Sequence, residues 1–153
     1  MDWFVRNFVK ASLLWFGLGT TLGLCIAVYP PWIIYRPAHL HLNLLGFVAM
    51  MIYGVAYHVM PRFSGHPLHS HRLAVAHWWI SNAGLALLVI GFVLAPHIGR
   101  TASPALALGA TLSAAGAYAF IWNLWRTLDG RVRAAPQIAP VDLVGLHRAT
   151  RRP

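Results

Sequence analysis

Four long windows without a charged side chain are the feature that most constrains the fold of this chain. They contain no Asp, Glu, Lys or Arg, and they cover residues 11–35, 37–61, 73–99 and 101–125. About 20 apolar residues are enough for a helix to cross the hydrocarbon core of a bilayer. Inside lipid the backbone of a spanning segment must satisfy its own hydrogen bonds, which favours a helix. The windows therefore predict an all-α membrane protein with four transmembrane helices.

The small number of charged residues argues against a soluble helical bundle. Only 10% of the residues are charged, against about 25% in an ordinary soluble domain, which is too few to solvate the outer faces of such helices. We expect one transmembrane domain over residues 1–127, followed by a basic, irregular tail over 128–153 that can touch anionic lipid headgroups. The expected helices cover residues 8–29, 38–60, 73–95 and 105–124.

Basic residues are distributed unequally between the two ends of the predicted helices. With four spans, both termini and the middle loop share one side, and that side carries ten Lys and Arg residues against Arg36 and Arg100 on the other. Because basic residues favour cytoplasmic loops, both termini should be cytoplasmic in a bacterial-type inner membrane. The formal net charge of +9 reflects this bias and the tail, and nucleic acid is not an expected partner.

Acidic residues and cysteine are nearly absent. The acidic residues are Asp2, Asp129 and Asp142, all outside the four windows. This distribution excludes a carboxylate pair for hydrolysis, a carboxylate relay inside the membrane and an acidic cage for a hard cation. Cys25 is the single cysteine, so neither an intrachain disulfide nor a Cys-x-x-Cys-His haem attachment can form. Histidine remains the residue type able to carry chemistry.

Eight of the nine histidines fall into two groups by expected depth, and the ninth, His147, lies in the tail. The outer group comprises His39, His41 and His97, and the inner group comprises His58, His66, His69, His71 and His77. A rise of about 1.5 Å per residue separates His41 from His58 by roughly 25 Å. One metal ion therefore cannot join the two groups.

The pair His39 and His41 is the most informative motif. Residues two apart on a helix point about 200° away from each other, so the pair can face two cofactors but cannot ligate one iron. Arg36 and Arg100 lie on the same side, where haem propionates would need cationic partners, and Asn43 adds a polar group below the pair. The alternative is that both histidines are interfacial and contact only water.

The inner histidines leave several alternatives open. His58 ends the second expected helix and His77 begins the third, so the two can approach each other and hold a second haem or a metal. Copper or zinc bound with His66, His69 or His71 is another option, since imidazole suits both metals. A solvated, hydrogen-bonded position at the membrane surface is the alternative for all of them.

Two stretches around these histidines resemble a known family. Residues 36–46, RPAHLHLNLLG, and residues 54–62, GVAYHVMPR, resemble the second helix of haem-copper oxidase subunit I. The likeness is nearest to the nitric oxide reductase and cbb3-type branches and to short subunit-I-like proteins. Residues 77–84 are similar to the next helix, so the resemblance covers about residues 36–92. In that family the second-helix histidine near the outer surface is an axial ligand of the low-spin haem, a role that the resemblance gives to His41 or His39.

The resemblance also carries expectations about assembly. The full subunit has about twelve helices, and its copper ligands and high-spin haem ligand lie on helices that this chain lacks, so the chain is not expected to be an enzyme on its own. The family fold contains three pseudo-equivalent arcs of four helices, and its tenth helix carries a His-x-His that serves two haems. The resemblance thus implies four helices like one arc, assembled as a homotrimer in which His39 of one protomer and His41 of the next hold a haem at each interface.

These observations predict a membrane protein with a bis-histidine, low-spin haem b. Such a haem suits electron transfer in a respiratory or nitric-oxide-related context, with a redox partner that the sequence does not identify. One alternative is a metal-handling or oxidase-assembly protein whose histidines hold copper or zinc. Another is a haem-based gas sensor in which one histidine binds iron.

Overall fold

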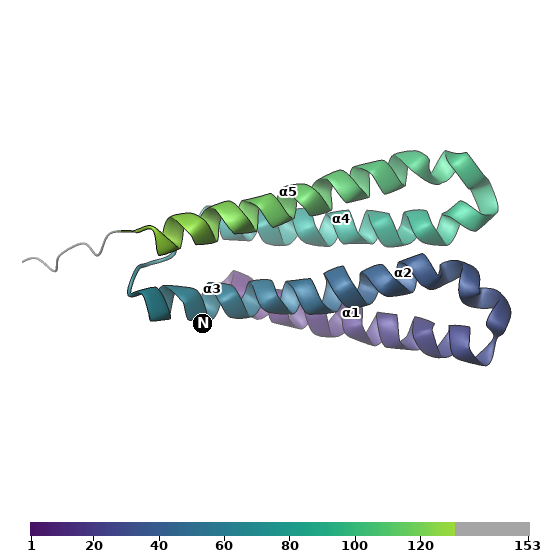
Figure 1. Cartoon of the computed structure of the whole chain (residues 1–153), viewed down its shortest axis with the longest axis horizontal. Helices are drawn as coiled ribbons and strands as arrows, with labels where there is room; N and C mark the ends of the chain where they lie inside the picture. Colours follow the sequence, from purple (N-terminus) through teal and green to yellow (C-terminus); the bar gives the residue numbers. More distant parts are fainter. Residues whose placement is uncertain (131–153) are drawn as a thin grey trace, which may run out of the picture.

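The computed structural model describes residues 1–130, and the elements in this part of the chain are all helices (Figure 1). The tail predicted from residue 128 onward lies outside the described residues except for its first three positions. The elements are α1 (Trp3–Val28), η1 (Pro30–Tyr35), α2 (Arg36–His41), η2 (Leu42–Ala49), α3 (Met50–Ser64), α4 (His71–Ile98), η3 (Gly99–Ala102) and α5 (Ser103–Leu128).

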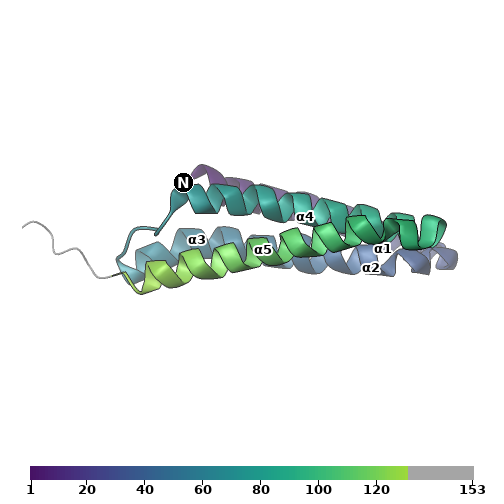
Figure 2. The same ribbon diagram turned by 90° about the horizontal axis from the view of Figure 1, so that it is seen from above.

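The helices form two antiparallel hairpins that lie side by side. In the first, α1 packs along the continuous run of α2, η2 and α3; in the second, α4 packs along α5 (Figure 1). Seen from above, α4 lies in front of α1 and α5 in front of α3 (Figure 2). We call the end that contains η1 and η3 the turn end, and the end where α1 begins and α5 ends the terminal end. Both turns that join the helices of a hairpin therefore lie at one end of the molecule.

Length and composition allow three continuous helical stretches to cross a membrane: Trp3–Val28, Pro30–Ser64 and His71–Leu128. The third is 58 residues long and contains α4, η3 and α5. Large apolar side chains on these stretches point outward; Leu14 is 62% exposed and Val28 is 76% exposed. Water would penalise such exposure, whereas lipid tails would not. The chain is therefore a membrane protein built from helices.

The second predicted helix is not one regular α-helix. Between α2 and α3 the eight residues of η2 form a π-helix, in which hydrogen bonds run from residue i to i+5. This segment begins directly after His41. Segments of π-helix often lie at functional sites.

The observed helices extend beyond most of their predicted boundaries, because the charged residues at their ends continue the helix. For example, α1 begins five residues earlier than expected, at Trp3, and α5 continues to Leu128. Local residues explain where the helices begin and end. Pro30 and Pro31 follow α1, and Gly65 ends α3 with a φ of 69°. At the start of α4 the Ser70 hydroxyl accepts a hydrogen bond from the Leu73 amide.

Glycines make the contact between α4 and α5 close. Gly84 and Gly91 on α4, and Gly109 and Gly116 on α5, are each seven residues apart, so each pair lies on one helix face. A Cβ on Gly84 would lie 2.7 Å from the Ser113 amide nitrogen, and a Cβ on Gly109 would lie 2.6 Å from the Leu88 amide nitrogen. The two backbones approach each other because these side chains are absent.

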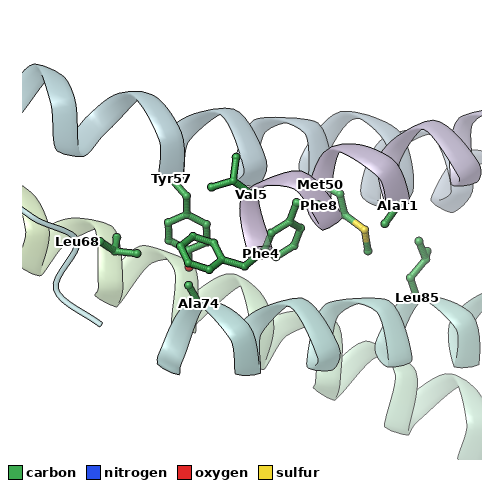
Figure 3. Close-up of a cluster of buried hydrophobic side chains, with 9 residues drawn as sticks. All are labelled: Phe4, Val5, Phe8, Ala11, Met50, Tyr57, Leu68, Ala74 and Leu85. Atoms are coloured by element: carbon green, nitrogen blue, oxygen red, sulfur yellow. The ribbon is translucent and has the colours of Figure 1, made fainter. Parts of the chain in front are cut away.

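The packed core lies mainly in the terminal half of the bundle. Phe4, Val5 and Phe8 from α1 meet Tyr57 from α3 and Ala74 from α4, with Leu68 closing the end (Figure 3). The Phe4 and Tyr57 rings meet edge to face with their centroids 5.5 Å apart, an arrangement that aromatic pairs prefer. This half therefore holds the two hairpins together.

A side-chain amide adds a polar link between the hairpins at the terminal end. Asn123 on α5 is fully buried. Its Oδ1 accepts from the Ser70 amide at 2.9 Å, and its Nδ2 donates to the Ser70 carbonyl oxygen at 2.9 Å. The hydroxyl of Thr127 accepts from the His69 amide at 3.0 Å. The loop between the hairpins is thus bonded to the end of α5.

Replacement of Gly109 tests the close contact of α4 and α5. Gly109→Ala places a methyl group against the backbone of Leu88, and overpacking of this kind costs about 1–3 kcal/mol. We expect a lower thermal unfolding temperature in detergent. Gly17→Ala is the matched control, because nothing lies within 4 Å of a Cβ at that position; equal unfolding temperatures for the two variants would contradict the packing.

Candidate haem-binding site

His39 lies against a gap in α1. Its Nδ1 is 2.9 Å from the Gly19 carbonyl oxygen, and a Cβ on Gly23 would lie 2.6 Å from its Cε1. One turn further along, the Asn43 amide donates to the His39 carbonyl oxygen at 2.8 Å, and a Cβ on Gly19 would lie 2.8 Å from the Asn43 Nδ2. Gly19 and Gly23 are four residues apart and share one face of α1, so together they make room for both polar side chains.

His41 faces the other hairpin. Its ring centroid is 4.7 Å from that of Phe92 on α4, with the planes inclined by 35°. Its Nδ1 is 2.8 Å from the Pro37 carbonyl oxygen. His39 and His41 therefore contact different helices, α1 and α4 respectively, which agrees with the angle of about 200° expected for residues two apart on a helix.

The backbone contacts favour the tautomer of each imidazole that suits metal ligation. A carbonyl oxygen can only accept a hydrogen bond, so the contacts of the His39 Nδ1 with Gly19 and of the His41 Nδ1 with Pro37 fit a proton on Nδ1. The Asn43 Nδ2 also lies 3.3 Å from the His39 Nδ1, but it already donates to the His39 carbonyl oxygen. The Nε2 of each ring then keeps its lone pair, which is the form of histidine that binds a metal. A hydrogen bond from the other ring nitrogen to a backbone carbonyl is also the usual way in which a metal-binding histidine is oriented. The two residues thus fit the ligation of haem iron.

An apolar groove of about 470 Å³ opens beside His41. Ligand pockets in proteins are commonly about 300–1,000 Å³ and mostly apolar. Alanines on α5 keep one wall of the groove shallow, which suits a flat apolar group. The lining residues come from both hairpins and comprise His41, Leu45, Tyr53, Leu88, Phe92, Leu106, Ala110, Ser113, Ala114 and Ala117.

Two arginines lie at the same end of the molecule as the histidine pair. Arg36 begins α2 and Arg100 lies in η3, and both are exposed. The acidic residues of the part that the structure describes, Asp2 and Asp129, lie at the terminal end. The guanidinium groups at the turn end are therefore available to anionic groups of a ligand.

His97, the third histidine of the turn end, is engaged in a contact within the protein. Its Nε2 is 2.9 Å from the Tyr35 hydroxyl oxygen. This hydrogen bond joins η1 to the last turn of α4. His97 therefore offers a control position at the same end of the bundle as His39 and His41.

His77 occupies a different environment, inside the bundle. It is fully buried, with its ring centroid 4.8 Å from that of Phe8, 4.6 Å from that of Tyr53 and 5.8 Å from that of Phe120. Its Nδ1 is 3.0 Å from the Tyr57 hydroxyl oxygen. Among the described residues its Nε2 is buried without a hydrogen-bond partner.

The structure does not bring His58 and His77 together. The His58 Nδ1 is 3.0 Å from the Arg62 guanidinium, and the same guanidinium donates to the His58 carbonyl oxygen. Consecutive residues of a helix point about 100° apart, and it is the preceding residue, Tyr57, that contacts His77. A second haem or metal that uses both histidines stays a prediction.

The histidines near the loop between the hairpins are also spread apart. His71 meets Phe4 edge to face, the His69 amide donates to Thr127, and the His66 ring lies beside Gly130. Within residues 1–130 no three His, Cys, Asp or Glu side chains are grouped closely enough to hold a metal ion. A copper or zinc site built from these histidines therefore has no support in the geometry.

Several residues of the site were not identified from the sequence. Gly19 and Gly23 form the gap that holds His39, and their spacing of four was the available signal. Phe92 stacks on His41, but a phenylalanine in an apolar helix looks like any packing residue. The hydrogen bond between Tyr57 and His77 depends on how two helices pack, which no local pattern shows.

The fold and the site define a class: a helical membrane protein in which α2, in the first hairpin, carries two imidazoles directed to opposite sides. The sequence matches the family model for cytochrome c and quinol oxidase polypeptide I over residues 4–144. Since this match covers most of the chain, the protein belongs to that family, the family of haem-copper oxidase subunit I. The predicted resemblance is confirmed, and it extends well beyond residues 36–92.

The chain is also similar to a curated oxidase subunit. The chain is 26% identical over 172 residues to the cbb3-type cytochrome c oxidase subunit CcoN1 of Stutzerimonas stutzeri. The match covers 88% of this chain and 36% of that subunit. The chain thus spans about a third of the length of the curated relative that it matches.

Replacement of Gly23 tests the gap that holds His39. Gly23→Ala brings a methyl group within contact of the His39 ring, so the ring must move and its Nδ1 should lose the hydrogen bond to Gly19. We expect the side-chain ¹⁵N signals of His39 to shift in NMR spectra of histidine-labelled protein, while those of His41 stay in place. Unchanged His39 signals, as expected for the control Gly17→Ala, would contradict the placement.

Proposed function

We propose that this protein is a membrane haem protein that transfers electrons, and that His39 and His41 are its axial ligands. The observation that carries the proposal is the arrangement of the two rings: each donates from Nδ1 to a backbone carbonyl, so each leaves Nε2 free to bind iron. Membership of the oxidase subunit I family supports the choice of haem as the group that they bind.

The residues around the pair have separate roles in this proposal. His41 lines the apolar groove, which excludes water from the iron. Asn43 and the two glycines of α1 hold the His39 ring in place. Arg36 and Arg100 lie at the turn end, where they can pair with the propionates of a haem b. When bound, the haem supplies an iron that accepts and releases one electron.

The ligand set favours electron transfer over catalysis. Two imidazoles complete the coordination of a haem iron, so no position is left open for a small gas molecule. The redox partner would belong to a respiratory or nitric-oxide-related chain, in keeping with the oxidase relative. The protein would then act by carrying electrons between other components of the membrane.

We further propose that the chain crosses the membrane four times with both termini in the cytoplasm of a bacterial cell. A helix of 58 residues would be about 87 Å long, almost three times the hydrocarbon thickness of about 30 Å. The turn η3 folds this stretch back on itself, so α4 and α5 can cross separately (Figure 1). The terminal end carries more basic residues than the turn end. Because basic loops tend to stay in the cytoplasm, this difference supports the orientation.

A homotrimer would give each haem its two ligands. Within one protomer, His39 and His41 face α1 and α4, so they cannot share an iron. In a closed ring, His41 of one protomer and His39 of the next can lie on the two sides of one haem. The three pseudo-equivalent arcs of four helices in the family fold support three as the number of copies.

Substitution of the two histidines tests the ligation. His39→Ala and His41→Ala should each leave the iron with one imidazole, which changes the absorption spectrum from a low-spin to a high-spin form, and the double variant should purify without haem. His97→Ala is the matched control at the same end of the bundle and should keep the wild-type spectrum. Undiminished haem in the double variant would contradict the assignment.

The mass of the purified protein tests the assembly. Native mass spectrometry or light scattering in detergent should give three chains and three haems for each particle, because every interface contributes one ligand from each neighbour. The double variant, His39→Ala with His41→Ala, should lose haem whether or not it remains trimeric. A monomer that carries its full complement of haem would contradict the trimeric assembly. The assignment of His39 and His41 as ligands would still be tested by the substitutions described above.

A further inference from the structure

Besides the Trp78 indole nitrogen, three buried polar atoms on α4 and α5 have no hydrogen-bond partner among the described residues. They are the Nε2 of His77, the hydroxyl oxygen of Ser81 and the hydroxyl oxygen of Ser113. His77 is fully buried and Ser81 is 6% exposed. A buried polar atom without a partner costs about 1–3 kcal/mol, so several together point to a partner that is not a protein atom.

The three atoms are close to one another. Ser81 is one helical turn beyond His77, so both lie on the same face of α4, and both flank Gly116 of α5: a Cβ there would collide with the Ser81 hydroxyl and lie 3.4 Å from the His77 Cδ2. Ser113 lies one turn from Gly116 on α5 and flanks Gly84. The glycine contacts thus bring polar groups of both helices to one place.

A small cavity lies between the two serines. Its volume is about 20 Å³, and it is lined by Leu45, Ala49, Met50, Tyr53, Ser81, Leu85 and Ser113. A site needs about 10–15 Å³ of this kind of volume to hold one water molecule, and it needs two to four polar neighbours. The cavity meets both conditions, and it is too small for any larger ligand.

We propose that a water molecule is bound in this cavity, hydrogen-bonded to the hydroxyl groups of Ser81 and Ser113, and that it forms part of a polar line through the bundle. On one side Ser81 adjoins His77, whose Nδ1 is bonded to Tyr57. Tyr57 in turn lines a pocket at the terminal end, together with Arg62, His66 and His71 among others.

On its other side the bound water adjoins the groove beside His41. Ser113 and Tyr53 line both the small cavity and that groove. The water would therefore bridge the hydroxyl groups of α4 and α5 beside the floor of the groove. The inference does not depend on whether the groove holds haem, because it uses only atoms of the chain.

The sign of the stability change on removal of each hydroxyl tests the proposal. If a water is bound, Ser81→Ala and Ser113→Ala each remove one of its partners, and each should lower the thermal unfolding temperature in detergent. If the cavity is dry, each substitution removes a hydroxyl that has no partner, and the unfolding temperature should stay the same or rise. That second result would overturn the proposal.

A double variant tests whether one water serves both serines. Ser81→Ala and Ser113→Ala together should lower the unfolding temperature by less than the sum of the single effects, because both lose the same water. Ser12→Ala is the matched control: Ser12 is fully buried, and its hydroxyl already donates to the Val9 carbonyl oxygen at 2.8 Å. Its effect should add to that of Ser81→Ala; additive effects of the two cavity serines would overturn a shared water.

A measurement on the unmodified chain covers the case in which a variant does not fold. In water-edited solid-state NMR spectra of the full chain in lipid, the Cβ signals of Ser81 and Ser113 should gain intensity from water as fast as surface residues do. The Ser12 Cβ, which is buried beside protein acceptors only, should gain it slowly. Slow transfer to all three serines would overturn the proposal.

Discussion

The hydrogen bond from the His39 Nδ1 to the Gly19 carbonyl oxygen is the interaction on which the site depends. It orients the ring and favours the tautomer in which Nε2 keeps its lone pair. The bond can form because Gly23, one turn along α1, has no side chain where the His39 ring lies. The His41 Nδ1 makes the corresponding contact with the Pro37 carbonyl oxygen, which belongs to its own helix. Each ring thus has its Nδ1 beside a backbone carbonyl oxygen, but the two rings face different hairpins.

The division of the bundle into two halves explains how such a site can exist. The aromatic core of Phe4, Phe8 and Tyr57 and the amide link of Asn123 hold the terminal half together. The other half, toward the turn end, contains the groove beside His41 instead of a packed core. A group bound in this groove would leave the contacts of the terminal half in place. The π-helix that follows His41 belongs to this same half.

Much of the fold could be predicted from the sequence, because lipid allows few alternatives. The charge-free windows located the helices. The π-helix of η2 could not be predicted, since the residues from Leu42 to Ala49 are as apolar as those of any spanning helix. In the site, the spacing of His39 and His41 gave their opposed directions. The glycine gap that holds His39 and the bond of His77 to Tyr57 depend on packing between helices, and so remained hidden.

Electron paramagnetic resonance of the oxidised protein, purified with ¹⁵N-labelled histidine, tests the central claim most directly. If imidazoles of the second helix hold the iron from both sides, the spectrum should be that of a low-spin ferric haem, and pulsed measurements should show two histidine nitrogens coupled to the iron. A protein that carries no haem, or a high-spin ferric haem with a single coupled histidine, would contradict the claim.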